Sequence, residues 1–209
     1  MRTYTAELVG TFALVFVGAG AAALGAVGVV GVALAHGLIL MVLVYAFGSL
    51  SGAHVNPAVT LGLWLRSEIE LRDALGYWAA QLVGGAVAGF ALLFIFGGPI
   101  NDLGATVLAN GVSPLQGLVL EAILTFFLVT SVLRSAVRGE AGDAVGAAVG
   151  LTLAASILVG GPVTGASLNP ARTFGPAVAT GQFTDIWVYF VGPLLGGAAA
   201  AALDRWLGE

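Results

Sequence analysis

Long apolar runs, separated by short polar or charged stretches, dominate the chain. Six of these runs approach the roughly 20 residues that an α-helix needs to cross the hydrocarbon core of a bilayer. They cover about residues 3–24, 32–50, 74–96, 114–133, 144–159 and 186–207. Charged or Gly-, Pro- and Asn-containing stretches at 66–73, 97–113 and 134–143 predict the loops between them. The pattern predicts an all-α membrane protein with six transmembrane helices.

Two shorter apolar segments begin with the same tripeptide. These are Asn56-Pro57-Ala58 and Asn169-Pro170-Ala171, each preceded by a run of small residues. Asn is a favoured N-cap, and Pro suits the first helical position because its missing N–H would have no partner there. Each segment has room for about ten helical residues, or roughly 15 Å, which is half a bilayer. We therefore expect two re-entrant half-helices that each begin at an Asn.

The chain also repeats itself. Glu7, Thr11 and Phe12 recur as Glu121, Thr125 and Phe126, 114 positions later, and the two Asn-Pro-Ala tripeptides are 113 positions apart (56 to 169). Each half holds three predicted spans, and an odd number forces the second half to enter the membrane from the opposite side. The sequence predicts a single domain over 1–209, an inverted repeat of about 1–98 and about 114–209 joined by an extracellular loop at about 97–113.

The basic residues support a definite orientation. All seven are Arg, and with the N-terminus inside, six of them fall on cytoplasmic segments; these are Arg2, Arg66, Arg72, Arg134, Arg138 and Arg205. This asymmetry is what the positive-inside rule expects, so both termini are predicted to be cytoplasmic. The exception, Arg172, follows the second Asn-Pro-Ala, and a charge at membrane depth indicates a water-filled cavity.

The composition narrows the class of protein further. Only 9% of the residues are charged and 59% are hydrophobic, which is typical of a protein in a lipid bilayer. The net charge of −4 supplies no surface for nucleic acid. Because the chain has no Lys and short predicted tails, we expect a compact prokaryotic protein, located as a multi-pass protein in the cell membrane.

The paired Asn-Pro-Ala tripeptides and the inverted repeat resemble the aquaporin (major intrinsic protein) family over nearly the whole chain. In the second half, residues 161–177 and 187–197 look like the vacuolar (tonoplast-intrinsic) branch. The resemblance implies the aquaporin fold and a passive water channel that excludes protons and ions and needs no cofactor or metal. It also implies a homotetramer, with no enzymatic activity. A broader glycerol or small-solute facilitator on the same fold is the alternative.

The resemblance carries over pore residues one by one. It places the side chains of Asn56 and Asn169 in the lumen, and it makes Arg172 the arginine of a narrow selectivity filter. The other filter positions become His36, Ile157 and Ala166. Water-selective bacterial members of the family typically have Phe and His where this chain has His36 and Ile157. The implied channel therefore also passes small neutral solutes, ammonia first, with urea and hydrogen peroxide as further candidates.

Some residues weigh against particular solutes. Ammonia-conducting vacuolar relatives use a His in the third loop, at a place that corresponds to about Thr106 here, which counts against ammonia. Glycerol-conducting relatives usually have Asp where this chain has Thr173, and Tyr189 and Phe190 also argue against glycerol.

Three buried polar residues have predicted structural roles. Glu7 and Glu121 are repeat mates inside spans, and buried carboxylates need hydrogen-bond donors, which the re-entrant loops can supply. We expect both to brace these loops; the alternative for Glu7 is a position facing the cytoplasm. His54 is expected to brace its loop, with a place in the lumen as the alternative.

Two function classes outside channels are disfavoured. A secondary transporter would need a carboxylate for ion coupling near the Asn-Pro-Ala pair, and the sequence has neither Asp nor Glu there. An intramembrane enzyme would need a nucleophile or an acid pair at span depth, and the chain has no Cys and no evident Ser/His or paired-Asp motif.

Overall fold

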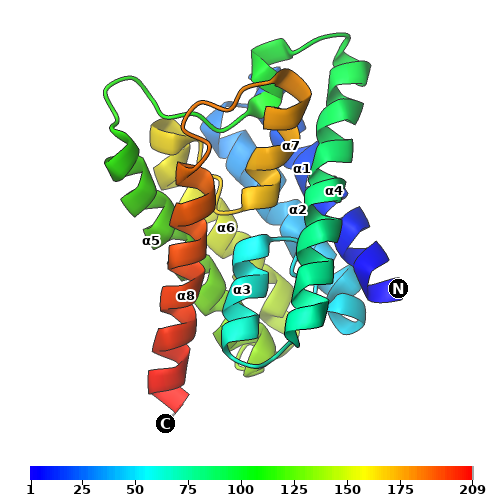
Figure 1. Ribbon diagram of the computed structural model, residues 1–209, viewed down its shortest axis with the longest axis vertical. Coiled ribbons are helices and arrows are strands. Elements are labelled where there is room, and N and C mark those ends of the chain that lie inside the picture. Colours follow the sequence, from blue (N-terminus) through cyan, green and yellow to red (C-terminus); the bar gives the residue numbers. More distant parts are fainter. Residues whose placement is uncertain (209) are drawn as a thin grey trace.

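Two short helices lie one above the other in the middle of a bundle of long helices (Figure 1). Within residues 1–208, which the computed structural model describes, the chain forms six long and two short α-helices. The long helices are α1 (Arg2–Leu24), α2 (Gly28–Ser51), α4 (Leu71–Phe96), α5 (Pro114–Val132), α6 (Val145–Thr164) and α8 (Val188–Gly208). The short helices are α3 (Pro57–Leu65) and α7 (Pro170–Thr180). The predicted architecture of six long helices and two half-helices is confirmed.

Five of the long helices in the described part of the chain are long and apolar enough to cross a membrane. The sixth, α8, has 21 residues and packs along α5. It is less apolar because Asp204 and Arg205 lie near its C-terminal end. These two residues belong to a charged cluster at one end of the bundle.

Three predicted loops are wrong in part, because helical turns enter them. Helix α4 begins at Leu71, so Arg72 and Asp73 are helical; Asp73 lies in the first turn, where the helix dipole favours an acid. A π-helical turn, Leu133–Val137, continues α5 into the predicted loop at 134–143. The predicted loop at 97–113 contains a short turn, η1 (Ile100–Gly104).

Each half-helix packs against the last long helix of the other repeat. Helix α3 lies on α8 and α7 lies on α4. The crossings are close: a Cβ added at Gly197 would lie 2.5 Å from the carbonyl oxygen of Ala58, and one added at Gly85 would lie 2.4 Å from that of Ala171. Only glycine permits this approach, as in other tightly packed membrane helices. The two crossings are related by the sequence repeat.

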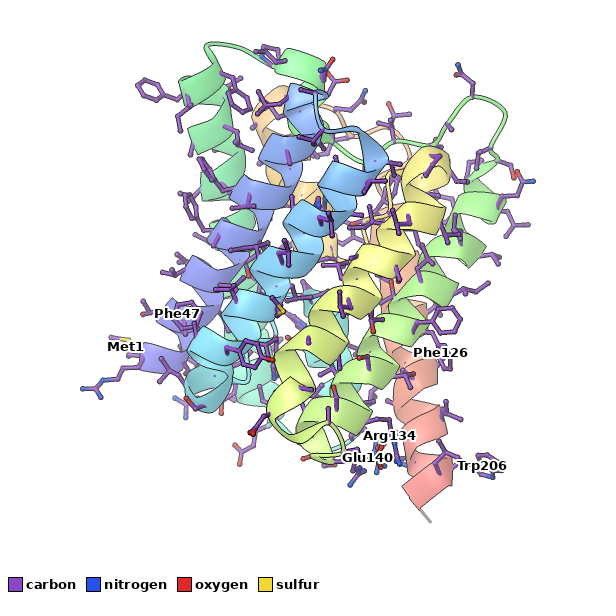
Figure 2. All side chains as sticks on the ribbon, turned by 180° about the vertical axis from the view of Figure 1, so that it is seen from behind. Met1, Phe47, Phe126, Arg134, Glu140 and Trp206 are labelled. Carbon is purple, nitrogen blue, oxygen red and sulfur yellow. The ribbon has the colours of Figure 1, made fainter. Side chains whose placement is uncertain are left out.

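The distribution of polar side chains is inverted relative to a water-soluble protein. Large apolar side chains such as Phe94 (88% exposed) and Leu115 (67% exposed) cover the outside (Figure 2). Glu7, Gln81 and Glu121 are fully buried inside the bundle. An apolar exterior around an interior that contains buried charged and polar side chains is the arrangement that a lipid bilayer stabilises.

Candidate pore

A narrow cavity inside the bundle shares lining residues with two wider pockets. This central cavity has a volume of about 30 Å³, which is room for about two water molecules. The pocket between the α1–α2 turn and the loop at 97–113 measures about 470 Å³ and is called the outer vestibule after the predicted orientation of the chain. The pocket beside the π-helical turn, called the inner vestibule, also measures about 470 Å³. Arg172 lines both the cavity and the outer vestibule, while Val132 and Ala136 line both the cavity and the inner vestibule.

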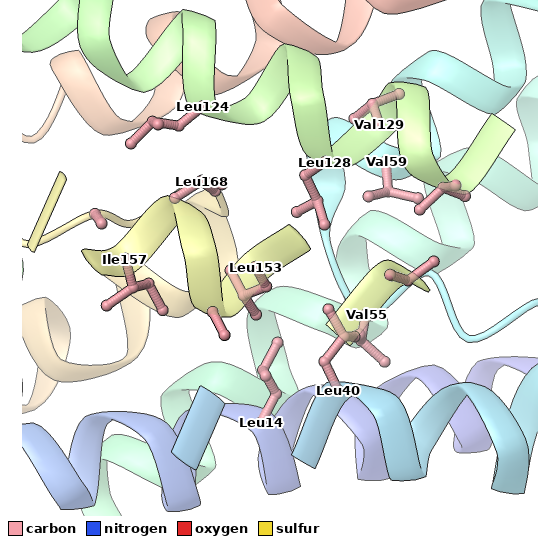
Figure 3. Close-up of a cluster of buried hydrophobic side chains, with 14 of the residues drawn as sticks. Leu14, Leu40, Val55, Val59, Leu124, Leu128, Val129, Leu153, Ile157 and Leu168 are labelled. Carbon is pink, nitrogen blue, oxygen red and sulfur yellow. The ribbon is translucent and has the colours of Figure 1, made fainter. Parts of the chain in front are cut away.

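The walls of the central cavity are mostly apolar. Figure 3 shows several of the buried apolar side chains that line it, among them Leu14, Leu40, Leu128 and Leu153. Leu14 on α1 and its repeat mate Leu128 on α5 line it, as do Leu40 on α2 and its repeat mate Leu153 on α6. All four are buried, at 2 to 5% exposure. Such walls offer water no hydrogen bonds, so the few polar groups in the cavity decide how water is held.

Asn56 and Asn169 supply polar groups to the wall of the cavity. Each caps its own half-helix: the Asn56 Oδ1 accepts from the Ala58 N–H at 2.9 Å, and the Asn169 Oδ1 accepts from the Ala171 N–H at 2.9 Å. Each side-chain NH₂ also donates to the loop of the other repeat. The acceptors are the Leu168 carbonyl for Asn56 and the Val55 carbonyl for Asn169, both at 2.8 Å. An amide NH₂ has two N–H donors, so each Asn keeps one for the lumen.

The loops before the half-helices adopt matching strained conformations. Ala53 and Val55 precede Asn56 with φ of 48° and 43°, and Ala166 and Leu168 precede Asn169 with φ of 45° and 54°. Left-handed backbone costs an L-residue roughly 1–2 kcal/mol. Strain of this kind persists only where surrounding contacts hold it, and two buried carboxylates supply such contacts.

Glu7 holds the first loop. Its carboxylate accepts from the backbone N–H groups of His54 at 2.9 Å and Val55 at 2.7 Å. It also accepts from the Ser51 hydroxyl at 2.7 Å and the Gln81 amide at 2.8 Å. The carboxylate therefore lies inside the bundle against the re-entrant loop, and the cytoplasm-facing alternative is not what the structure has.

Glu121 holds the second loop in the same way. It accepts from the backbone N–H groups of Ser167 at 3.0 Å and Leu168 at 2.8 Å, and from the Thr164 hydroxyl at 2.7 Å. The two carboxylates are equivalent under the repeat, and both approach the strained residues directly.

The side chain of His54 lies in the first loop and lines the central cavity. Its Nδ1 lies 3.1 Å from the Thr60 hydroxyl, and its ring packs edge-on against Tyr77 with centroids 4.9 Å apart. The His54 ring therefore contacts Thr60 and Tyr77 and also lines the central cavity.

Arg172 lies at the junction of cavity and outer vestibule and is only 2% exposed. Its Nη1 donates to the Gly104 carbonyl at 2.7 Å, and its Nε donates to the His36 Nε2 at 3.3 Å. Ile157 lines the outer vestibule near this point. Ala166 is buried between Gly165, which lines the outer vestibule, and Ser167, which lines the cavity. The four predicted filter residues thus lie at or next to the boundary between the cavity and the outer vestibule.

The contacts of His36 fix its tautomer. Arg172 Nε can only donate, so the His36 Nε2 must be the acceptor. The proton then sits on Nδ1, which lies 2.9 Å from the Val32 carbonyl and donates to it. His36 is therefore a neutral ring that holds the guanidinium, and its Nε2 lone pair is already occupied.

Sequence reasoning missed three parts of this site. The Gly104 carbonyl depends on a loop turn that hydropathy does not reveal. Gly18 on α1 makes room for the filter, since a Cβ there would lie 2.3 Å from the His36 ring. Asp204, 1% exposed, receives the Arg66 and Arg138 guanidinium groups at 2.9 and 2.7 Å near the inner vestibule.

The charged cluster at Asp204 marks one end of the bundle. Arg134 also reaches Asp204, at 3.6 Å, and pairs with Glu140 (Figure 2). The hydrogen bond with Asp204 raises the pKa of Arg138 above its ordinary value, so this guanidinium stays charged. The cluster ties the π-helical turn beside the inner vestibule to α8.

Comparisons with known proteins agree with this geometry. Residues 1–203 match the protein family described as Major intrinsic protein. Aquaporin TIP2-1 of Arabidopsis thaliana is 41% identical, over 97% of this chain and 86% of that protein. Aquaporin NIP1-1 of Oryza sativa subsp. japonica is 43% identical, over 94% of this chain and 70% of that protein.

The fold has a similar solved structure as well. The X-ray structure of the aquaglyceroporin from Plasmodium falciparum superposes with a TM-score of 0.89 at 27% identity, covering 99% of this chain and 96% of that one. The family resemblance found in the sequence is thereby confirmed. The chain belongs to the major intrinsic protein family and is an aquaporin-type channel for water and small solutes, not an enzyme.

Proposed function

We propose that the chain is a passive water channel that excludes protons and ions and also passes small neutral solutes. The observation that carries this proposal is the narrow cavity of about 30 Å³ that shares lining residues with two vestibules of about 470 Å³ each. Water crosses such a path one molecule at a time. Its selectivity is then set by the groups at the narrow points, which are Asn56, Asn169 and the filter of His36, Ile157, Ala166 and Arg172.

The Asn pair supports proton exclusion. A water molecule beside Asn56 and Asn169 accepts the remaining amide N–H of each, so its lone pairs are occupied and its own hydrogens point away along the pore. It cannot accept a proton from a neighbouring water in this orientation. The N-terminal ends of α3 and α7 meet at the same level, and their positive dipole ends raise the energy of a cation there.

Arg172 adds a fixed positive charge at the outer end of the cavity. It repels cations, including hydronium, before they reach the Asn pair. The lone pair of the neighbouring His36 Nε2 is used by Arg172, and Ile157 has only apolar atoms to offer. The filter therefore presents few hydrogen-bonding groups to a solute, which favours small neutral molecules.

Ammonia is the first solute that we propose besides water, followed by urea and hydrogen peroxide. Thr106, at the place of the third-loop His of ammonia-conducting relatives, is hydrogen-bonded to Thr173 at 2.7 Å. Its hydroxyl is thus occupied, which argues for a modest ammonia rate. Glycerol facilitation is the alternative, and Thr173 in place of the usual Asp argues against it.

We further propose a homotetramer in which each protomer has its own pore. The two repeats, about 1–98 and about 114–209, form one channel domain, and the 97–113 loop is extracellular. The cluster of Arg66, Arg134 and Arg138 at one end supports cytoplasmic termini. We expected a cell membrane from the composition. The TIP names of the relatives favour a vacuolar membrane instead, and membrane fractionation of the source cells distinguishes the two.

Stopped-flow light scattering on proteoliposomes tests the solute range. Ammonia, urea and glycerol gradients are applied to the native chain and to a variant with His36→Phe and Ile157→His. We expect ammonia and urea flow in the native chain, with little glycerol flow, and loss of the solute flow in the double variant while water flow remains. Solute flow that is equal in both proteins would contradict the assigned filter. Glycerol flow comparable to urea flow would favour the alternative.

A further inference from the structure

We propose that the η1 turn of the third loop fixes the orientation of Arg172, and that Leu103 and Asn101 are the positioning residues that hold this turn. The proposal rests on the channel function proposed above. It adds a specificity-determining element outside the four filter residues and the two Asn-Pro-Ala tripeptides.

The Gly104 carbonyl is the structural link. It accepts the Arg172 Nη1 at 2.7 Å, while His36 holds the Nε of the same guanidinium at 3.3 Å. The guanidinium is therefore held against the wall between α2 and the third loop. A short hydrogen bond to a fixed carbonyl is directional, so the position of Gly104 decides how far the guanidinium extends into the lumen.

The turn that presents this carbonyl is strained. Asn101, Asp102 and Leu103 follow one another in left-handed conformation, with φ of 43°, 48° and 52°. Asn and Asp tolerate this region, but a branched residue such as Leu rarely adopts it. Gly104 follows with φ of 68°, and a Cβ there would lie 2.4 Å from the Ala19 carbonyl oxygen. Such a turn needs anchors to persist.

Leu103 is the first anchor. It is fully buried, at 0% exposure, in a cluster with Val15, Ala19, Ala88 and Leu92. This cluster lies between α1 and α4, so the side chain fastens the loop to two long helices. Burial of a whole Leu side chain offsets the strain of its backbone.

Asn101 is the second anchor. Its Nδ2 donates to the Ala23 carbonyl at 2.7 Å. Ala23 lies in the last turn of α1, where carbonyl groups have no partner within the helix. The bond joins the start of the left-handed turn to the end of α1, while Leu103 fastens its other end.

A chain of hydroxyl groups ties the next part of the loop to the second half-helix. Thr106 Oγ1 donates to Thr173 Oγ1 at 2.7 Å, and Thr173 Oγ1 donates to Ser167 Oγ at 2.6 Å. Thr173 directly follows Arg172. The loop is therefore held to long helices before Gly104 and to α7 after it, and the Gly104 carbonyl lies between these two attachments.

Without the anchors, the Gly104 carbonyl is no longer held at Arg172, and the guanidinium enters the lumen. Flow scales with the fraction of open channels, so a blocked state populated about half of the time halves the flow. We therefore expect Leu103→Ala and Asn101→Ala each to lower water permeability per protein about twofold or more, with the same proportional loss for urea. Val107→Ala is the matched control, since Val107 lies in the same loop and is 43% exposed.

Variants made in an Arg172→Ala background distinguish a loss of Arg172 positioning from a folding defect of the channel. In an Arg172→Ala background no guanidinium can block the pore, so adding Leu103→Ala or Asn101→Ala should leave water permeability equal to that of Arg172→Ala alone. A folding defect would persist in this background. Asn101→Ala deletes one hydrogen bond of an exposed residue and puts Ala in a left-handed conformation, so it loosens the turn without opening the buried cluster. It therefore keeps the test decisive if Leu103→Ala does not fold.

Stopped-flow measurements on proteoliposomes with matched protein content give all of these values. Native permeability in the single variants, or equal losses with and without Arg172, would overturn the proposal while leaving the channel function intact. A native chain that conducts no water would overturn the channel function, and this inference with it.

Discussion

Replacing Glu121 by Gln tests whether the buried carboxylates hold the strained re-entrant loops. The Oε1 of Glu121 accepts from Thr164 and Ser167, and its Oε2 accepts from the Leu168 N–H at 2.8 Å. A Gln places its oxygen at the site with two donors and turns its NH₂ toward the Leu168 N–H. One buried donor then lacks an acceptor.

The magnitude follows from that lost bond. A buried donor without a partner costs about 1–3 kcal/mol. A value near 2 kcal/mol makes opening of the loop roughly 30-fold more frequent, since 1.4 kcal/mol is a factor of ten. Hydrogen exchange reports the frequency of such local opening. We expect the amides of Ser167 and Leu168 to exchange about 30-fold faster in Glu121→Gln.

The repeat provides the control. The backbone N–H groups of His54 and Val55 donate to Glu7, so Glu7→Gln should accelerate hydrogen exchange at these two amides. It should leave the exchange rates of residues 167 and 168 unchanged. Mass spectrometry of peptides from both loops measures each variant against the native protein. Unchanged exchange in both loops, or equal acceleration of both loops by either variant, would refute the bracing role.

Three further outcomes are expected. Gly18→Ala should lower water permeability, because its Cβ would lie 2.3 Å from the His36 ring and force the ring from its place. The control Gly48→Ala, whose Cβ would meet no described atom within 4 Å, should leave water permeability unchanged. Stopped-flow traces that match for the two variants would contradict this expectation. Asp204→Asn should lower the free energy of unfolding by about 1–2 kcal/mol, which is less than the cost of breaking a fully buried ion pair because the Arg partners are partly exposed. An unchanged thermal melting temperature would contradict this expectation. Mercuric chloride should leave water flow unchanged because the chain has no Cys, and inhibition would contradict a thiol-free pore.

Hydropathy and helix capping reveal most of the fold. The six apolar runs correspond to six long helices, and Asn56 and Asn169 begin the two half-helices where the capping argument placed them. The errors lie at helix ends. Arg134 lies in a helical turn, and its guanidinium reaches Asp204, 70 positions away in the sequence, at 3.6 Å. Polarity along the chain cannot show such a partner.

The site is less accessible to sequence reasoning. The repeat brought Glu7 and Glu121 to attention, and the family resemblance supplied His36, Ile157, Ala166 and Arg172 as candidates. The acceptor of the Arg172 Nη1 is a backbone carbonyl, and every residue has one. What selects Gly104 is the left-handed turn before it, which depends on burial of Leu103 between helices distant in sequence.

Water and proton flow measured in the same vesicles test the central claim most directly. Proteoliposomes that contain a trapped pH-sensitive dye are exposed to a sucrose step and then to a pH step. We expect fast shrinkage with a low activation energy, and proton entry no faster than in empty liposomes. Shrinkage as slow as in empty liposomes, or proton entry that rises together with the water flow, would contradict it.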